Sequence, residues 1–234
     1  MPDGSAPDKS KPTDHMAGHR ERLRKRFVAS PAAVPDYELL ELILFRTIPR
    51  RDVKPLAKEL IATFGSFGST IHADPARLND VKGISDATIA DFAILRETTA
   101  RLTQAKVMKR EVISSWGALL DYCFAAMAHN SIEQFRILFL DRQNVLIADE
   151  VQQTGTIDHT PVYPREVVKR ALALNASSII LVHNHPSGDP TPSRDDITMT
   201  QQIIDTAKPL GITVHDHLVI GKGKHASFKS LGLI

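Results

Sequence analysis

The chain has 234 residues, of which 42% are hydrophobic and 24% are charged, and its formal net charge is +2. This length and apolar content are enough for one large or two modest domains, which excludes disorder of the whole chain. Cys123 is the single cysteine, so an internal disulfide and a multi-cysteine metal site are excluded, and the near-neutral charge is no general sign of nucleic-acid binding.

The apolar segments are short. The longest are residues 38–45 and 177–182, well below the roughly 20 residues that a membrane-spanning helix needs. The N-terminus carries charges and prolines but no apolar secretion signal. Together with the lone cysteine, these features predict a cytoplasmic protein without a membrane partner. The oligomeric state is left open.

Polar residues and prolines fill the first 15 positions, which we expect to form a disordered tail. A basic cluster follows between residues 20 and 26. It comprises Arg20, Arg22, Arg24, Lys25 and Arg26. Such a cluster is typical of a solvated helix or tail, and the alternative is an arm that contacts phosphates.

Helical periodicity begins near Asp36. Apolar residues then recur at helical spacing, a second such segment covers 53–64, and Gly65 follows it as a stop signal. A third helix is predicted to begin with Ser85 as its N-cap. These features predict a small all-helical domain over residues 16–105.

The segment LNDVKGISDATIADFAILRE, at 78–97, contains a glycine turn between two helical patterns. It resembles a helix-hairpin-helix module, in which backbone amides at the turn bind a nucleic-acid phosphate. The resemblance makes Lys82, Gly83 and Ser85 candidate phosphate-binding residues. The alternative is a plain pair of helices joined by a glycine, because Ser85 stands at the second glycine position and Asp86 adds negative charge.

In the second half of the chain, segments with the helical period of 3.6 residues alternate with segments that have the strand period of two. The polar, basic segment 103–112 is predicted to be a linker. Helices are expected at 116–127, 163–174 and 193–210, and strands at 133–141, 145–151, 178–185 and 212–221. This order predicts an α/β domain over 112–234 with a mixed or antiparallel sheet, and the chain as a whole is of the α+β class.

Two histidines close the apolar strand at 178–185. His183 and His185 are two residues apart, so their side chains emerge on one face with Cα atoms about 6.6 Å apart. A proline-rich loop leads back to Asp196 in the first turn of the next helix. Two imidazoles and one carboxylate are the ligands of a catalytic zinc site with an open position.

Each part of this pattern also has a structural explanation. Ser193 and Asp196 alone form an ordinary capping box for a helix, and an isolated pair of histidines at a strand end is common on surfaces. Their combination in one segment favours a metal site.

The segment HNHPSGDPTPSRDD, at 183–196, contains the order His, one residue, His, seven residues, Ser, two residues, Asp. This order resembles the JAMM motif of MPN-type metalloproteases. With the segments at 163–172 and 216–221, it resembles more narrowly the RadC family, of the UPF0758 type, long labelled DNA repair proteins. Tyr163 stands where that family has a histidine. The resemblance implies a JAMM/MPN-type zinc domain over 112–234.

The resemblance also implies a reaction, the hydrolysis of a peptide or isopeptide bond in a protein or peptide substrate. One Zn²⁺ per chain would lower the pKa of a bound water to roughly 7. Glu133 is favoured over Glu150 and Glu166 as the general base, because the motif places its glutamate before a strand of this character. Ser193 would donate a hydrogen bond to the developing oxyanion.

His215 and His217 lie two apart on the strand at 212–221 and are expected to face the same way. They would support the ligands or contact substrate, or they would only pack beside the site. A rival function also remains open. The chain would then be a DNA-associated repair or recombination accessory protein that binds nucleic acid through its helical domain, with the zinc domain as a binding module.

Overall fold

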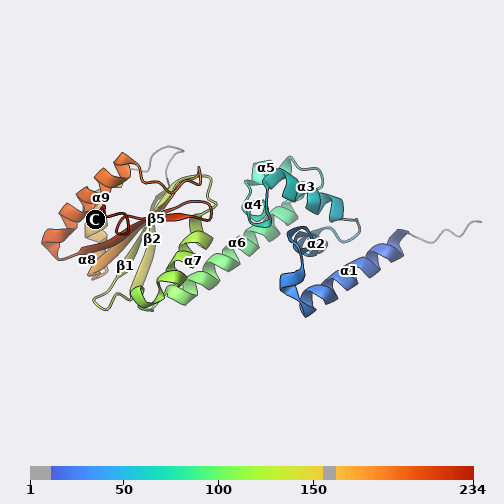
Figure 1. The fold of residues 1–234 in the computed structure, drawn as a ribbon, viewed down its shortest axis with the longest axis horizontal. Coiled ribbons are helices and arrows are strands. Elements are labelled where there is room, and N and C mark those ends of the chain that lie inside the picture. Colours follow the sequence, from blue (N-terminus) through green and yellow to red (C-terminus); the bar gives the residue numbers. More distant parts are fainter. Residues whose placement is uncertain (1–11, 155–161) are drawn as a thin grey trace, which may run out of the picture. The chain divides into compact units, whose positions relative to one another are not determined.

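A helical unit precedes a unit of mixed helices and strands (Figure 1). The computed structural model describes residues 12–154 and 162–234. Contacts between Cα atoms place the boundary between Ile94 and Leu95. The predicted α+β class is therefore confirmed. Among the helices of the described residues, none combines the length and apolar character needed to cross a membrane.

Short helices form the first unit. They are α1 (Pro12–Ala29), α2 (Asp36–Thr47), α3 (Lys54–Phe64), α4 (Phe67–Ile71), α5 (Pro75–Asn79) and the start of α6 (Asp86–Val107). The predicted apolar stripes form its core, where Leu40, Leu44, Leu60 and Phe92 are fully buried. Gly65 ends α3 as predicted, because its φ of +92° is a conformation that favours glycine.

The predicted tail and linker are partly wrong. Residues 12–15 belong to α1, whereas residues 1–11 lie outside the described part of the chain. Leu23, among the basic residues of α1, is buried, and Arg20 donates to the carbonyl oxygens of Ile48 and Arg51, so apolar and polar contacts together dock this helix. The linker predicted at 103–112 is helical through Val107. Val107 and Val112 are both fully buried in the core of the second unit, which orders the segment.

The second unit is built on a mixed sheet, as predicted. Its helices after α6 are α7 (Trp116–Met127), α8 (Pro164–Ala173) and α9 (Arg194–Ala207). Its strands are β1 (Gln134–Leu140), β2 (Leu146–Thr154), β3 (Ser178–Asn184), β4 (Thr213–Ile220) and β5 (His225–Ser227). They lie in the order β2-β1-β3-β4-β5, with β3 and β4 parallel and the other neighbours antiparallel.

Helices cover both faces of this sheet, with α7 on one side and α8 and α9 on the other (Figure 1). The alternation of β1 divides its side chains between the two cores. Phe135, Ile137 and Phe139 pack with α8 and α9, while Leu138 and Leu140 pack with α7. Because β1 and β3 are buried on both faces, their middle residues, 137–140 and 179–182, are all apolar.

The α7 side of the sheet also contains a buried polar network. The Nη1 atom of Arg136, on β1, donates to Asp149 Oδ2 on β2 at 2.6 Å, and the Tyr122 hydroxyl donates to the same carboxylate oxygen. Burial and the negative charge of Asp149 raise the pKa of Tyr122 well above its usual value. Burial also raises the pKa of the neighbouring Cys123 thiol to about 12, so this cysteine stays protonated at neutral pH.

Candidate metal centre

The end of β3 brings two imidazole rings together. His183 is fully buried, and its Nε2 atom lies 3.0 Å from Nε2 of His185. The ring of Phe135, which lies opposite His183 on β1, stacks on the His183 ring at 6.2 Å between centroids. The strand register and this stacking hold the first imidazole in a fixed orientation.

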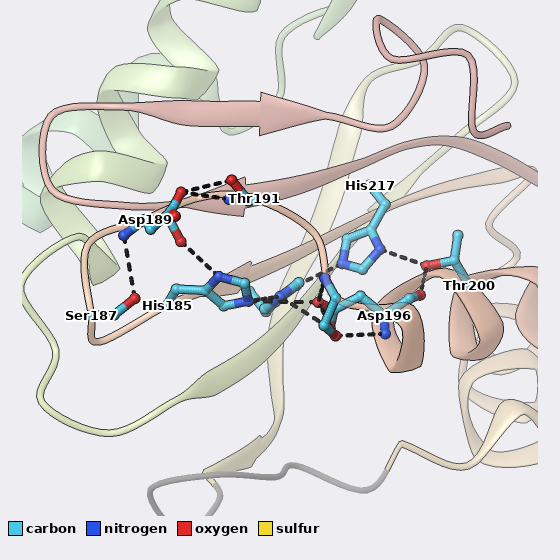
Figure 2. A network of polar contacts seen from close by, with 9 residues as sticks. His185, Ser187, Asp189, Thr191, Asp196, Thr200 and His217 are labelled. Carbon is cyan, nitrogen blue, oxygen red and sulfur yellow. Dashed lines mark hydrogen bonds and ion pairs between the residues drawn. The ribbon is translucent and has the colours of Figure 1, made fainter.

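A carboxylate from α9 meets the two rings. Asp196 Oδ1 lies 3.3 Å from His183 Nε2, and Asp196 Oδ2 lies 3.6 Å from His185 Nε2. One possible ligand atom of each residue lies within 4.8 Å of the others. Figure 2 shows His185 and Asp196 turned toward each other. The three residues that the sequence selected as metal ligands therefore converge on one point.

Asp196 is also part of a capping box at the start of α9. The Ser193 hydroxyl accepts a hydrogen bond from the Asp196 amide at 3.1 Å, and the Ser193 amide donates to Asp196 Oδ2 at 2.7 Å. The structural and the metal-binding explanations of this pair are therefore compatible. The cap orients the carboxylate toward the histidines.

The ring nitrogens and carboxylate oxygens of this cluster are arranged as a cation would require. The Nδ1 atom of His185 lies 2.8 Å from the carbonyl oxygen of Asp189, and a carbonyl only accepts, so Nδ1 carries the ring proton. The Nε2 lone pair of neutral His185 then faces His183 and the Asp196 carboxylate. Acceptors that point at one another need a shared proton or a cation, and this His-His-Asp group could hold a metal ion.

The charges at the site agree with this arrangement. Burial raises the pKa of the Asp196 carboxyl, but when a shared proton lies between the carboxylate and the imidazoles, hydrogen bonds from His183 and His185 outweigh burial and hold this pKa well below its usual range. The hydrogen bond to Asp196 raises the pKa of His185, against an opposing effect of burial, and the charge of Glu133 contributes in the same direction. Asp196 is therefore a carboxylate at neutral pH.

Glu133 lies at the same end of the sheet. It directly precedes β1, in which Phe135 is opposite His183 and the amide of Gln134 donates to Asn184 Oδ1 at 2.9 Å. Side chains two residues apart on a strand point to the same face of the sheet. Glu133 is two residues before Phe135, so its side chain is expected on the face where Phe135 stacks on His183. Its electrostatic effect on His185 indicates the same proximity.

The two other glutamates have cationic neighbours elsewhere. Glu150, on β2, pairs with Arg170 of α8, with 2.8 Å between Arg170 Nε and Glu150 Oε2. Glu166, in the first turn of α8, lies within 4 Å of Arg165 and Lys169. Neither carboxylate belongs to the His-His-Asp group.

The two histidines of β4 do not act together, so their predicted common orientation is wrong. His217 is fully buried, and its Nε2 atom lies 2.8 Å from Nδ1 of His183. His215 instead contacts Asn144 Oδ1 at 2.7 Å, in the turn between β1 and β2 at the other end of the sheet. A bulge in β4, beside Ile179 and Ile180, breaks the alternation between them.

The helical hairpin is a tight turn between α5 and α6. Gly83 has a φ of +105°, which favours glycine, and Ser85 caps α6 by accepting from the Thr88 amide at 3.4 Å. Lys82 is exposed, and Arg51 Nη2 lies 3.5 Å from the carbonyl oxygen of Gly83. Phosphate binding by this turn stays a prediction.

Sequence reasoning missed Thr200, whose hydroxyl contacts both His217 and Asp196 in Figure 2. Thr200 lies four residues after Asp196, which places it on the same face of α9. The sequence spacing therefore predicts that Thr200 lies near Asp196. It does not predict the contact between Thr200 and His217, because β4 follows later in the chain.

The comparisons with known proteins agree with these observations. Residues 113–233 match the RadC-like JAB domain family. The chain is 59% identical over 221 residues to UPF0758 protein SPO0054 of Ruegeria pomeroyi, across 94% of this chain and 99% of the relative. It is 61% identical over 213 residues to a UPF0758 protein of Rhodobacter capsulatus, across 91% of this chain and 100% of the relative. The chain therefore belongs to the RadC family.

Proposed function

We propose that this protein is a zinc-dependent hydrolase of the JAMM metalloprotease type that cleaves a peptide or isopeptide amide bond. The convergence of His183, His185 and Asp196 on one point is the observation that carries the proposal. Two neutral imidazoles and a carboxylate are the protein ligands found in catalytic zinc sites. Membership in a family with a JAB domain supports the same reaction class.

Four residues have distinct roles in the proposed reaction. His183, His185 and Asp196 would hold the zinc ion, which as a Lewis acid makes water a nucleophile at neutral pH. Glu133 accepts a proton from the attacking water on its carboxylate and returns it to the nitrogen of the leaving amine. Its place before β1, on the sheet face of His183, supports this assignment.

Ser193 is assigned the stabilisation of negative charge on the substrate carbonyl oxygen. Its Oγ atom lies 2.6 Å from Asp196 Oδ2, so its hydroxyl is at the site and donates to this carboxylate. In the proposed reaction, rotation about its Cα–Cβ bond would redirect the hydroxyl toward the substrate carbonyl oxygen. Removing one such donor in other hydrolases costs roughly 100- to 1,000-fold in rate.

Metal removal and restoration test the reaction. The purified full-length chain is incubated with a library of fluorescence-quenched peptides, in which one subset carries lysine side-chain isopeptide bonds. We expect cleavage that is lost after dialysis against a chelator and regained with one equivalent of zinc. Cleavage that persists in the metal-free protein, or no cleavage of any member by the zinc-loaded protein, would contradict the proposal.

The hairpin supports a second candidate function, nucleic-acid binding by the helical unit. Arg51 adds positive charge beside Gly83, and Lys82 is exposed at the same turn. Arg20 also reaches this region, because its Nη2 atom donates to the carbonyl oxygens of Ile48 and Arg51, both at 2.7 Å.

A further inference from the structure

A buried chain of hydrogen bonds joins α9 to β3 through β4. The Thr200 hydroxyl lies 2.6 Å from the carbonyl oxygen of Asp196 and 2.6 Å from His217 Nδ1. His217 Nε2 lies 2.8 Å from His183 Nδ1. At most 1% of the surface of Thr200, His217 or His183 is exposed, so these contacts are shielded from water. Figure 2 shows Thr200 and His217 directed toward each other.

The chemistry of each atom fixes the direction of each hydrogen bond. The Asp196 carbonyl can only accept, so it takes the single hydroxyl proton of Thr200, in the way common for threonine in a helix. Toward His217 the Thr200 oxygen can then only accept. His217 Nδ1 must therefore carry a proton.

Burial determines the state of the rest of the His217 ring. Its neighbours include Phe228 at 4.4 Å and Phe135 at 5.7 Å between ring centroids. An apolar environment of this kind disfavours the doubly protonated, charged imidazole. With its one proton on Nδ1, His217 accepts at Nε2, and His183 must donate from Nδ1.

We propose that Thr200 and His217 are positioning residues that select the tautomer of His183 with a proton on Nδ1 and a free lone pair on Nε2. That lone pair points to Asp196 Oδ1 and His185 Nε2. The opposite tautomer would direct an N–H into the metal site and could not ligate an ion. The inference rests on the proposed metal centre and names the residues that prepare it.

The tautomers of the two imidazoles are thus set by different groups. His185 Nδ1 donates to a backbone carbonyl in its own loop, that of Asp189. His183 depends on two side chains from other elements, α9 and β4. Of the two imidazoles, only that of His183 should therefore be sensitive to substitution of Thr200.

The test compares two substitutions of Thr200. Thr200→Val removes the hydroxyl and keeps the shape, whereas Thr200→Ser keeps the hydroxyl. The zinc dissociation constant of each full-length protein is measured by competition with a chromogenic chelator. We expect Thr200→Val to bind zinc roughly 10- to 100-fold more weakly and Thr200→Ser to bind within a few-fold of the wild type. Equal affinity in Thr200→Val, or equal loss in both variants, would overturn the proposal.

A second measurement does not require a variant to fold. Nitrogen-15 NMR of imidazole-labelled, metal-free wild type reports which ring nitrogen of His217 is protonated. We expect the proton on Nδ1. A proton on Nε2 would refute the proposed chain of hydrogen bonds. Absence of zinc binding by the wild type would instead contradict the proposed function, so the two failures are distinguishable.

Discussion

Ser193 and Asp196 are joined by reciprocal hydrogen bonds, and the same Asp196 carboxylate faces the two histidines of the candidate metal centre. Its Oδ2 atom accepts from the Ser193 amide at 2.7 Å, while its Oδ1 atom lies 3.3 Å from His183 Nε2. The capping box restricts the rotation of Asp196. Helix capping and metal binding are therefore coupled through one side chain.

Substitutions in this pair should separate the two roles. Ser193→Ala removes the cap hydroxyl and should lower the free energy of unfolding by about 1 kcal/mol, while zinc is retained. Asp196→Ala should lose the zinc and the carboxylate's half of the capping box, while its backbone amide still donates to the Ser193 hydroxyl. Denaturant unfolding of the metal-free proteins and metal analysis of the zinc-loaded proteins measure these effects. Loss of zinc in Ser193→Ala would place this serine among the groups that metal binding requires.

The metal content of the purified protein is the simplest prediction. We expect about one zinc per chain in the wild type and none when His183 and His185 are both changed to alanine. The double variant should remain folded, because the second unit has an apolar core on each face of its sheet. Equal zinc in the wild type and the double variant would refute the site.

Glu133→Gln should retain zinc and the fold but lose hydrolysis by roughly 100-fold or more, because glutamine keeps the shape but cannot accept a proton. The assay uses a fluorescence-quenched peptide that the wild type cleaves. Glu150→Gln is the matched control and should remain active, since Glu150 pairs with Arg170 away from the site. An inactive, zinc-loaded Glu150→Gln together with an active Glu133→Gln would reverse the assignment.

The buried network of the second unit should contribute strongly to stability. Arg136→Met leaves the Asp149 carboxylate buried without its cationic partner, and we expect a loss of about 3–5 kcal/mol. Arg170→Met breaks the more exposed pair with Glu150 and should cost much less, because water screens a pair at the surface. Chemical denaturation of both variants measures the difference. Similar losses would mean that burial does not distinguish the two pairs.

Nucleic-acid binding by the hairpin predicts a dependence on salt. The affinity of the full chain for a short DNA duplex should fall steeply as salt is raised, and Lys82→Gln should reduce the slope of the log–log plot by about one. Lys169→Gln is a control in the second unit, where the lysine pairs with Glu166 on α8. Undetectable binding at low salt would favour the plain structural hairpin.

The sequence predicted features that depend on neighbours along the chain. The helix at 116–127 has the expected bounds, and the apolar stripes of α2 and α3 form a core. These features are periodicities, glycine stops and helix caps, each of which involves only a few neighbouring residues. They can therefore be recognised from the sequence without knowledge of the fold. The spacing of His183, His185 and Asp196 is equally local, since one strand end, one loop and one helix start contain all of them.

Contacts between distant segments were decided by the tertiary structure. Thr200 meets His217 because β4 pairs with β3 in parallel beneath α9, and a bulge separates His217 from His215. The polar residues at 103–107 are helical because a buried core orders their end at Val107. Local patterns determined the elements and the ligand spacing. Packing decided which side chains share a buried environment, because that choice depends on strand order, register and helix placement.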